Sequence, residues 1–226
     1  MSLTPRMVEV RSRILKENDL LARTLRESFQ RAGVTVISFV SSPGAGKTTF
    51  LEKLMLAMSP DYRIAALVGD LATENDAARL LGACSQVRQI TTGTICHLDA
   101  KMIANALQGW KLGELDFLFI ENVGNLVCPS SYDLGEQARF VLLSSTEGED
   151  KPLKYPTIFN TADVALITKR DLAAAAEFDS ASAQKNIQNV RPGMRVIKVS
   201  SKTGLGLNEV IEMVRDYQRR LSVKAS

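Results

Sequence analysis

The spacing that most clearly predicts chemistry is at residues 41–49, Ser-Ser-Pro-Gly-Ala-Gly-Lys-Thr-Thr, which follow an apolar run. These residues match the G-x-x-x-x-G-K-[ST] pattern except at its first glycine, where this chain has Ser41. In such a loop glycines let backbone N–H groups turn toward a phosphate, and the next helix adds its dipole. Lys47 would neutralise the β- and γ-phosphates, and the Thr48 hydroxyl would ligate Mg²⁺. The residues expected to bind nucleotide phosphates are Gly44, Ala45, Gly46, Lys47, Thr48 and Thr49.

A later apolar run, 163–167, leads into Thr-Lys-Arg-Asp at 168–171. This segment resembles the guanine-reading N-K-x-D motif of GTPases, with Thr168 in place of Asn. Asp171 can accept hydrogen bonds from N1–H and the exocyclic amine of guanine, a donor pair that adenine lacks. The stem of Lys169 would lie along the base. A loop that would meet guanine O6 through backbone amides, as an S-A-K loop does, is predicted at Ser200, Ser201 and Lys202. The order and spacing of these motifs favour GTP over ATP.

Three carboxylates lie between the two motifs. Asp70 and Glu121 each end a predicted strand, and Asp76 opens a predicted helix. Carboxylates at strand ends beside a phosphate loop usually hold Mg²⁺, directly or through water. For Asp76, a role as an acid that stabilises the helix N-terminus is an equal alternative. Together with Lys47 they form the predicted catalytic set. Nothing in the sequence resembles a strong catalytic base, so we expect slow GTP hydrolysis, as in a switch.

Cysteine and histidine residues indicate a second kind of site. Cys96 is followed by His97, the only histidine, and Cys128 comes seven residues after Glu121. Both thiols are therefore expected in loops at the sheet edge that holds the γ-phosphate. Two thiolates and an imidazole suit Zn²⁺ or Ni²⁺, and a fourth ligand would be water or a residue of a second subunit. The alternative, small buried cysteines and a core histidine, is the interpretation that we adopt for Cys84.

Short apolar runs alternate with helical segments along the chain, and this order indicates the fold that positions the motif-bearing loops. The runs are rich in Val, Ile, Leu and Phe without strict alternation, as in strands buried on both faces of a parallel sheet. Strands are predicted at 34–40, 63–68, 87–90, 115–120, 139–143, 163–168 and 195–199. Helices are predicted at 47–58, 75–81, 98–108, 180–190 and 207–221, and a long polar loop at 148–156. The pattern predicts a doubly wound α/β fold with a mainly parallel sheet, whose ligands bind at the C-terminal strand ends.

The first part of the chain has the pattern of an amphipathic helix. We predict that residues 1–33 form an N-terminal helix packed on the same domain, and that residues 34–226 form the P-loop GTPase domain. Gly33 would end this helix. Its apolar stripe consists of Val10, Ile14, Leu21, Leu25 and Phe29.

Composition excludes several classes of protein. The 226 residues are 45% hydrophobic and 23% charged, which is ordinary for a globular protein. A net charge of +3 is too small to indicate a nucleic-acid surface. No apolar run approaches the roughly 18 residues of a membrane span, and the N-terminus has no apolar signal segment. Three cysteines cannot form a disulfide framework in a chain of this size. We expect a cytoplasmic protein with neither a nucleic-acid nor a membrane partner.

Five motifs together resemble those of the hydrogenase nickel-incorporation GTPases, the HypB family. They are the phosphate loop, Gly-Asp with Asn-Asp-Ala at 69–77, Thr-Gly-x-x-Cys-His-Leu-Asp-Ala at 92–100, Glu-Asn-Val-Gly-Asn-Leu-Val-Cys-Pro at 121–129, and Lys-x-Pro-x-x-Phe at 154–159. The resemblance covers about residues 5–221 and accounts for Ser41. It implies a P-loop NTPase fold of the SIMIBI type and a metallochaperone that helps place nickel in [NiFe]-hydrogenase.

The resemblance also implies a homodimer when GTP is bound, with Lys154 reaching the base across the dimer. The metal site would be Cys96, His97 and Cys128, coupled to the switch regions. Implied partners are a small zinc-containing nickel chaperone and the precursor of the hydrogenase large subunit. Because the sequence lacks the N-terminal Cys-rich or His-rich stretch of many members, nickel storage is not expected.

Two other classes of function compete with this interpretation. A P-loop small-molecule kinase would leave Asp171 and the 200–206 loop unexplained, and relative affinity for GTP and ATP separates the two. A GTPase chaperone of another metalloenzyme or of a cobalamin enzyme is the other alternative. For a chaperone of a cobalamin enzyme, Cys96, His97 and Cys128 would have no metal function. Measuring metal binding with and without nucleotide separates this alternative from a nickel chaperone.

Overall fold

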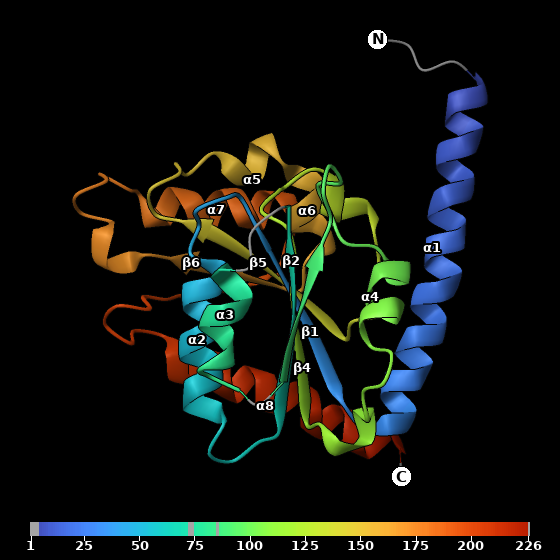
Figure 1. Cartoon of the computed structure of the whole chain (residues 1–226). Coiled ribbons are helices and arrows are strands. Elements are labelled where there is room, and N and C mark those ends of the chain that lie inside the picture. The colour runs from blue at the N-terminus through green and yellow to red at the C-terminus, as the bar shows by residue number, and fades with distance from the viewer. Residues whose placement is uncertain (1–4, 72–74, 85, 226) are drawn as a thin grey trace.

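A seven-stranded parallel sheet forms the centre of the molecule (Figure 1). The computed structural model describes residues 5–71, 75–84 and 86–225. The strands are β1 Thr35–Ser41, β2 Ile64–Asp70, β3 Gln86–Thr91, β4 Phe117–Glu121, β5 Ala138–Ser144, β6 Val164–Thr168 and β7 Arg195–Lys198. Their spatial order is β3-β2-β4-β1-β5-β6-β7, and each pair of neighbours is parallel. The phosphate loop therefore leaves a strand that has neighbours on both sides.

Helices cover both faces of this sheet. In Figure 1, α2 and α3 lie on one side of the sheet, and α1 and α4 lie on the opposite side. The helices are α1 Pro5–Ala32, α2 Lys47–Met58, α3 Asn75–Leu81, α4 Ala100–Ala106, α5 Lys151–Lys154, α6 Pro156–Thr161, α7 Ser180–Val190 and α8 Leu207–Ala225. Short 3₁₀ turns are η1 Leu112–Glu114, η2 Cys128–Ser131 and η3 Arg170–Leu172. The doubly wound α/β fold predicted from the alternation of runs is confirmed.

The core is divided by the sheet into two layers. On the α2 side, the buried Phe39 ring centroid lies 6.3 Å from that of Phe50, 5.8 Å from Phe119 and 5.4 Å from Phe140. On the other side, Phe29 of α1 is buried among residues of β1, β4 and α4. Alternate residues of one strand point to opposite faces, so the continuous apolar run of β1 supplies both layers.

Two local predictions need correction. The segment 148–156 is not one polar loop, because α5 starts at Lys151 and α6 starts at Pro156. Proline is suited to a first helical turn, where its missing N–H has no intrahelical partner. The helix predicted at 98–108 is α4, which begins only at Ala100 because Asp99 caps it: Oδ1 of Asp99 accepts a hydrogen bond from the Met102 N–H at 2.7 Å.

The N-terminal helix ends at Ala32, and Gly33 follows with φ +71°. Of its predicted stripe, Leu25 and Phe29 are buried and Leu21 packs beside them, whereas Ile14 is 49% exposed. The side chain of Val10 and residues 1–4 lie outside the described part of the chain. Of the four stripe residues whose side chains are described, the three from Leu21 onward pack into the core, and Ile14 does not.

Candidate functional site

The phosphate loop joins the end of β1 to the first residue of α2, Lys47. Gly44 and Gly46 have φ values of +73° and +90°, which only glycine adopts readily. The Lys47 ammonium donates a hydrogen bond to the Ser41 hydroxyl at 3.0 Å. Serine in place of the first glycine therefore supplies an acceptor for this lysine. Burial lowers the pKa of Lys47, while nearby carboxylates, above all Glu121, act in the opposite direction.

Glu121 lies beside the phosphate loop because β4 pairs with β1, with Phe39 and Glu121 in register. Oε1 of Glu121 accepts a hydrogen bond from the Thr48 hydroxyl at 2.7 Å, and its Oε2 is buried without a hydrogen-bond partner. Burial raises the pKa of Glu121 to about 7, against the opposing effects of Lys47 and Thr48. An unpartnered buried carboxylate oxygen next to a threonine hydroxyl is a donor set that fits Mg²⁺.

A cavity of about 520 Å³ opens over this loop. Asp70 and Asp76 both line it, and Asp70 accepts a hydrogen bond from the Leu71 N–H at 2.7 Å. Arg79 of α3 also lines it and donates to Thr49 and Glu52 of α2. Residues 72–74, between the two aspartates, lie outside the described part of the chain. The cavity lining is Pro43, Gly44, Gly46, Lys47, Thr48, Thr49, Gly69, Asp70, Leu71, Asp76, Arg79, Glu121, Asn122, Val123, Gly124 and Lys169.

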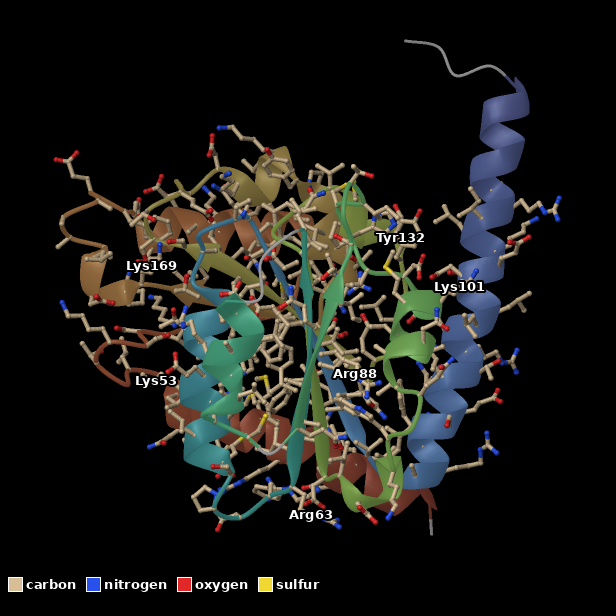
Figure 2. All side chains as sticks on the ribbon, viewed as in Figure 1. Lys53, Arg63, Arg88, Lys101, Tyr132 and Lys169 are labelled. Carbon is tan, nitrogen blue, oxygen red and sulfur yellow. The ribbon has the colours of Figure 1, made fainter. Side chains whose placement is uncertain are left out.

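The end of β6, where the first predicted guanine motif begins, contacts the phosphate loop. The Thr168 hydroxyl donates to the Ala45 carbonyl at 2.8 Å, and the Lys169 ammonium donates to the Gly44 carbonyl at 2.7 Å. Threonine in place of Asn thus still ties the end of β6 to the phosphate loop. Figure 2 shows Lys169 on the side of the molecule that carries α2.

The two guanine loops are also joined to each other. Oδ1 of Asp171 accepts a hydrogen bond from the Ser200 hydroxyl at 2.6 Å, and this bond lowers the pKa of Asp171. The Ser200 hydroxyl in turn accepts from the Thr203 N–H, which orders the turn that contains Ser201 and Lys202. Asp171 is therefore an ionised acceptor beside the turn that contains Ser201 and Lys202.

The predicted cysteine and histidine ligands are brought together. One ligand atom from each of Cys96, His97 and Cys128 lies within 4.8 Å of the others. The two sulfur atoms are 2.7 Å apart; the hydrogen bond between them, helped by burial, raises the pKa of the Cys96 thiol. Burial lowers the pKa of His97, and its Nδ1 is buried without a hydrogen-bond partner. A neutral imidazole beside two thiols is a donor set for a soft divalent ion.

Tyr132 is a residue of this cluster that sequence reasoning missed. Its ring stacks on that of His97, with centroids 3.9 Å apart and planes 24° from parallel. An aromatic residue shortly after Cys128 carries no motif of its own, so no signal in the sequence distinguished it. Figure 2 shows Tyr132 above α4, on the side of the sheet that α1 covers.

The segment between Glu121 and Cys128 contacts both sites. Oδ1 of Asn122 accepts from the Leu98 N–H at 3.1 Å, and the Asn125 amide donates to the Cys96 carbonyl at 3.1 Å. A Cβ on Gly124 would lie 2.9 Å from Cα of Pro43, so this glycine is needed for close approach to the phosphate loop. The sequence predicted that this segment couples the two sites, because Cys128 is only seven residues after Glu121. The contacts of the two asparagines were not predicted.

Two predicted residues lie away from these clusters. Lys154 on α5 forms an ion pair with Asp150 at 2.6 Å, and its side chain is 61% exposed. It does not line the cavity over the phosphate loop. Cys84 packs against the core on the α2 side, where its thiol donates to the Leu80 carbonyl. The interpretation of Cys84 as a core cysteine agrees with this position.

Among the helices that the structure describes, none combines the length and apolar character needed to span a membrane.

Comparison with known proteins places these features in a family. Residues 34–198 match the family model described as CobW/HypB/UreG, nucleotide-binding domain. The hydrogenase maturation factor HypB of Rhizobium leguminosarum is 43% identical over 89% of this chain and 68% of that protein. The hydrogenase/urease maturation factor HypB of Helicobacter hepaticus is 42% identical over 96% of this chain and 88% of that protein.

Solved structures agree with the sequence matches. The crystal structure of HypB from Helicobacter pylori in complex with nickel superposes with a TM-score of 0.85 at 41% identity, covering 90% of this chain and 96% of that one. HypB from Archaeoglobus fulgidus gives 0.84 at 36% identity, covering 90% and 99%. The signal recognition particle receptor FtsY of Elizabethkingia anophelis, at 13% identity and a TM-score of 0.52, shares the fold alone. The chain therefore belongs to the CobW/HypB/UreG family and, within it, to the HypB maturation factors.

Proposed function

We propose that this protein is a metallochaperone that hydrolyses GTP slowly and helps to insert nickel into [NiFe]-hydrogenase. The observation that carries the proposal is the placement of the Cys96–His97–Cys128 cluster at the same sheet edge as the phosphate loop, with 121–128 in contact with both. The nickel named for the Helicobacter pylori relative supports Ni²⁺ as the cargo. A kinase would have no use for a thiol cluster at this position.

In the proposed GTPase site, Lys47 neutralises the β- and γ-phosphates and Asp171 reads guanine. Mg²⁺ would be held by Thr48 and Glu121, with Asp70 nearby, and would neutralise charge on the phosphates. The unpartnered Oε2 of Glu121 supports this assignment. Slow turnover is proposed because Glu121 is assigned to Mg²⁺ and no other residue of the predicted set resembles a strong catalytic base. Asp76, which also lines the cavity, is the remaining acidic group proposed to contribute to hydrolysis.

In the proposed metal site, Ni²⁺ or Zn²⁺ binds to Cys96, His97 and Cys128. Each of these residues is partly exposed, as a site shared between two molecules would be. Ile95 and Val127 flank the ligands and are 41% and 59% exposed, which supports an apolar contact at this face. We propose that GTP-bound protein forms a homodimer here, with water or the second subunit completing the coordination and Lys154 reaching the base of the other subunit.

The proposed setting of this activity is the cytoplasm, with a small zinc-containing nickel chaperone and the hydrogenase large-subunit precursor as partners. Residues 1–33 are proposed to be a helical extension of the domain formed by 34–226. Another nickel enzyme is a second candidate recipient, because the relative from Helicobacter hepaticus is a hydrogenase/urease maturation factor. Both recipients require the same metal site.

The test is a titration with Ni²⁺ and Zn²⁺ in the presence of GDP or a non-hydrolysable GTP analogue. Binding is read by native mass spectrometry and thiolate-to-metal absorption, and association by sedimentation. The parent should bind metal and gain dimer with the GTP analogue, and metal should strengthen that dimer by linkage. A Cys96→Ala/Cys128→Ala variant should bind GTP and lose the metal-dependent gain. Identical metal binding and association in both proteins would leave a GTPase without a metal function.

A further inference from the structure

Among the residues of α1 whose side chains the structure describes, 12–32, the one buried polar side chain is Asn18. Asn18 is 8% exposed, whereas the next residue, Asp19, is exposed. Its amide nitrogen donates to the Asp133 carbonyl at 2.9 Å, and its amide oxygen accepts from the Ala100 N–H at 2.9 Å. Asparagine is a poor helix former, and burial of its amide costs free energy unless both ends are bonded. Helix formation alone therefore does not account for this residue.

Both backbone groups bonded to Asn18 belong to loops that carry candidate metal ligands. Ala100 begins α4 three residues after His97. Asp133 follows Tyr132, whose ring stacks on His97, and lies five residues after Cys128. A single side chain of α1 thus spans the loop of Cys96 and His97 and the loop of Cys128. Figure 2 shows Tyr132 and Lys101, the residue after Ala100, on the side of the sheet that α1 covers.

Two further contacts fix α1 against the second loop. The Arg26 guanidinium donates to both carboxylate oxygens of Asp133, at 2.6 and 2.7 Å. Gly135 has φ +81°, and a Cβ there would lie 2.8 Å from the Ala22 carbonyl oxygen, so the loop touches the helix backbone. Because these contacts extend over two turns of α1, the position of the helix and the position of the loop are linked.

We propose that Asn18 is a positioning residue of the metal site, and that α1 is the element that sets its geometry. Asn18 fixes the separation of the two ligand-bearing loops, so a displacement of α1 loosens the thiol and imidazole set and lowers metal affinity. The inference rests on the proposed metal function. Groups that orient metal ligands without touching the ion typically change affinity about 10–100-fold when they are removed. The competing explanation is that Asn18 only satisfies buried backbone groups.

The experiment compares Asn18→Leu and Asn18→Asp with the parent, all in a Cys84→Ser background. Asn18→Leu removes both hydrogen bonds, and Asn18→Asp keeps the acceptor for Ala100 while losing the donor to Asp133. The control is Asp19→Ala, an exposed position on the same helix. Ni²⁺ affinity is measured by chelator competition, and the reactivity of Cys96 and Cys128 toward a disulfide reagent is measured without metal.

We expect Asn18→Leu to weaken Ni²⁺ binding by about tenfold or more and to speed thiol modification, with GDP affinity unchanged. Asn18→Asp should fall between it and the parent, and Asp19→Ala should match the parent. If Asn18→Leu does not fold, Asn18→Asp and Arg26→Gln decide the question, with Arg23→Gln as the exposed arginine control.

Unchanged Ni²⁺ affinity and unchanged thiol reactivity in folded Asn18 variants would overturn the inference. Failure of the proposed function has a different signature, since the parent would then show no nickel binding that depends on Cys96 and Cys128. In that case the thiol reactivity of the metal-free protein still reports whether Asn18 positions the two loops.

Discussion

The Thr48 hydroxyl donates a hydrogen bond to Oε1 of Glu121 across 2.7 Å, joining the first turn of α2 to the end of β4. The bond occupies one carboxylate oxygen and leaves the other, Oε2, buried and unpartnered at the cavity wall. It also brings together two residues that a motif search treats separately. The pair is the structural basis for a Mg²⁺ site at this position.

Glu121→Gln tests that site with little change of shape. Glutamine can still accept the Thr48 hydrogen bond, but it lacks the negative charge that Mg²⁺ requires. A charged contact is worth about 1.5–3 kcal/mol, so the Mg²⁺ concentration for half-maximal GTP hydrolysis should rise roughly tenfold or more. The measurement is hydrolysis rate against Mg²⁺ concentration, with Glu114→Gln as an exposed control. An unchanged Mg²⁺ dependence would remove Glu121 from the metal site.

Lys47→Ala and Asp171→Ala should weaken GTP binding for different reasons. Loss of Lys47 removes phosphate neutralisation and should weaken every nucleoside triphosphate. Loss of Asp171 removes a charged acceptor for guanine worth about 1.5–3 kcal/mol, so GTP affinity should fall and the weaker affinity for ATP should not. Competition binding with fluorescent nucleotides measures both. Equal losses of GTP and ATP in Asp171→Ala would contradict the guanine assignment.

Gly124→Ala should disturb both sites at once. The added methyl would meet Pro43 of the phosphate loop at 2.9 Å, and Gly124 lies within the segment that leads to Cys128. Overpacking of this kind typically costs about 1–3 kcal/mol, and we expect part of it to appear as weaker GDP and Ni²⁺ binding. Calorimetric titration measures the two affinities. Gly113→Ala is the matched control, because a Cβ there meets no atom within 4 Å.

The ion pair between Arg26 and Asp133 should make the stability of the protein depend on pH. Burial alone would raise the pKa of Asp133, but the hydrogen bond and charge of Arg26, together with the hydrogen bonds of Gly135 and Glu136, outweigh burial and the pKa is lowered. A carboxylate with a lowered folded-state pKa stabilises the fold above its unfolded pKa of about 3.9 and loses this effect as pH falls through the folded value. Because both partners are about a third exposed, the contribution should be roughly 0.2–1 kcal/mol.

Asp133→Asn should therefore unfold at lower urea concentration than the parent at pH 7, and the gap should narrow as pH falls below about 4. Asparagine can still accept the Gly135 N–H hydrogen bond that Oδ1 of Asp133 receives. Urea unfolding at a series of pH values gives the comparison, and Asp19→Asn on α1 serves as the exposed control. A gap that stays constant from pH 7 to pH 3 would show that the pair contributes nothing.

Sequence patterns predicted the elements well where a strong local signal exists. The boundaries of α2, Lys47 and Met58, follow from a glycine turn before a continuous helical segment. The clustering of Cys96 with Cys128 followed from the rule that parallel strands end at one edge. A local signal also produced the wrong prediction of a loop at 148–156. The charged residues around Pro152 suggested a loop, although proline favours a first helical turn.

The contacts that hold the ligand loops were not predictable from spacing. Asn18 and Asp133 are 115 residues apart, and neither belongs to a motif. An asparagine in an amphipathic helix gives no sign of whether it faces solvent or bonds to a distant loop. The stacking of Tyr132 on His97 depends in the same way on how two loops meet, which one sequence without its structure does not determine.

The position of β4 between β2 and β1 has a consequence for the order in which the chain assembles. Both neighbours of β1, β4 and β5, are synthesised after residue 116, although the phosphate loop that β1 carries ends by residue 49. Pairings over such separations have a large loop-closure cost and form late in folding. The phosphate loop is thus synthesised early, but the strands that flank β1 are available only once residues up to 144 have been synthesised. Binding of a fluorescent guanine nucleotide would therefore report the completion of the sheet, and fragments that stop before β4 should not acquire it.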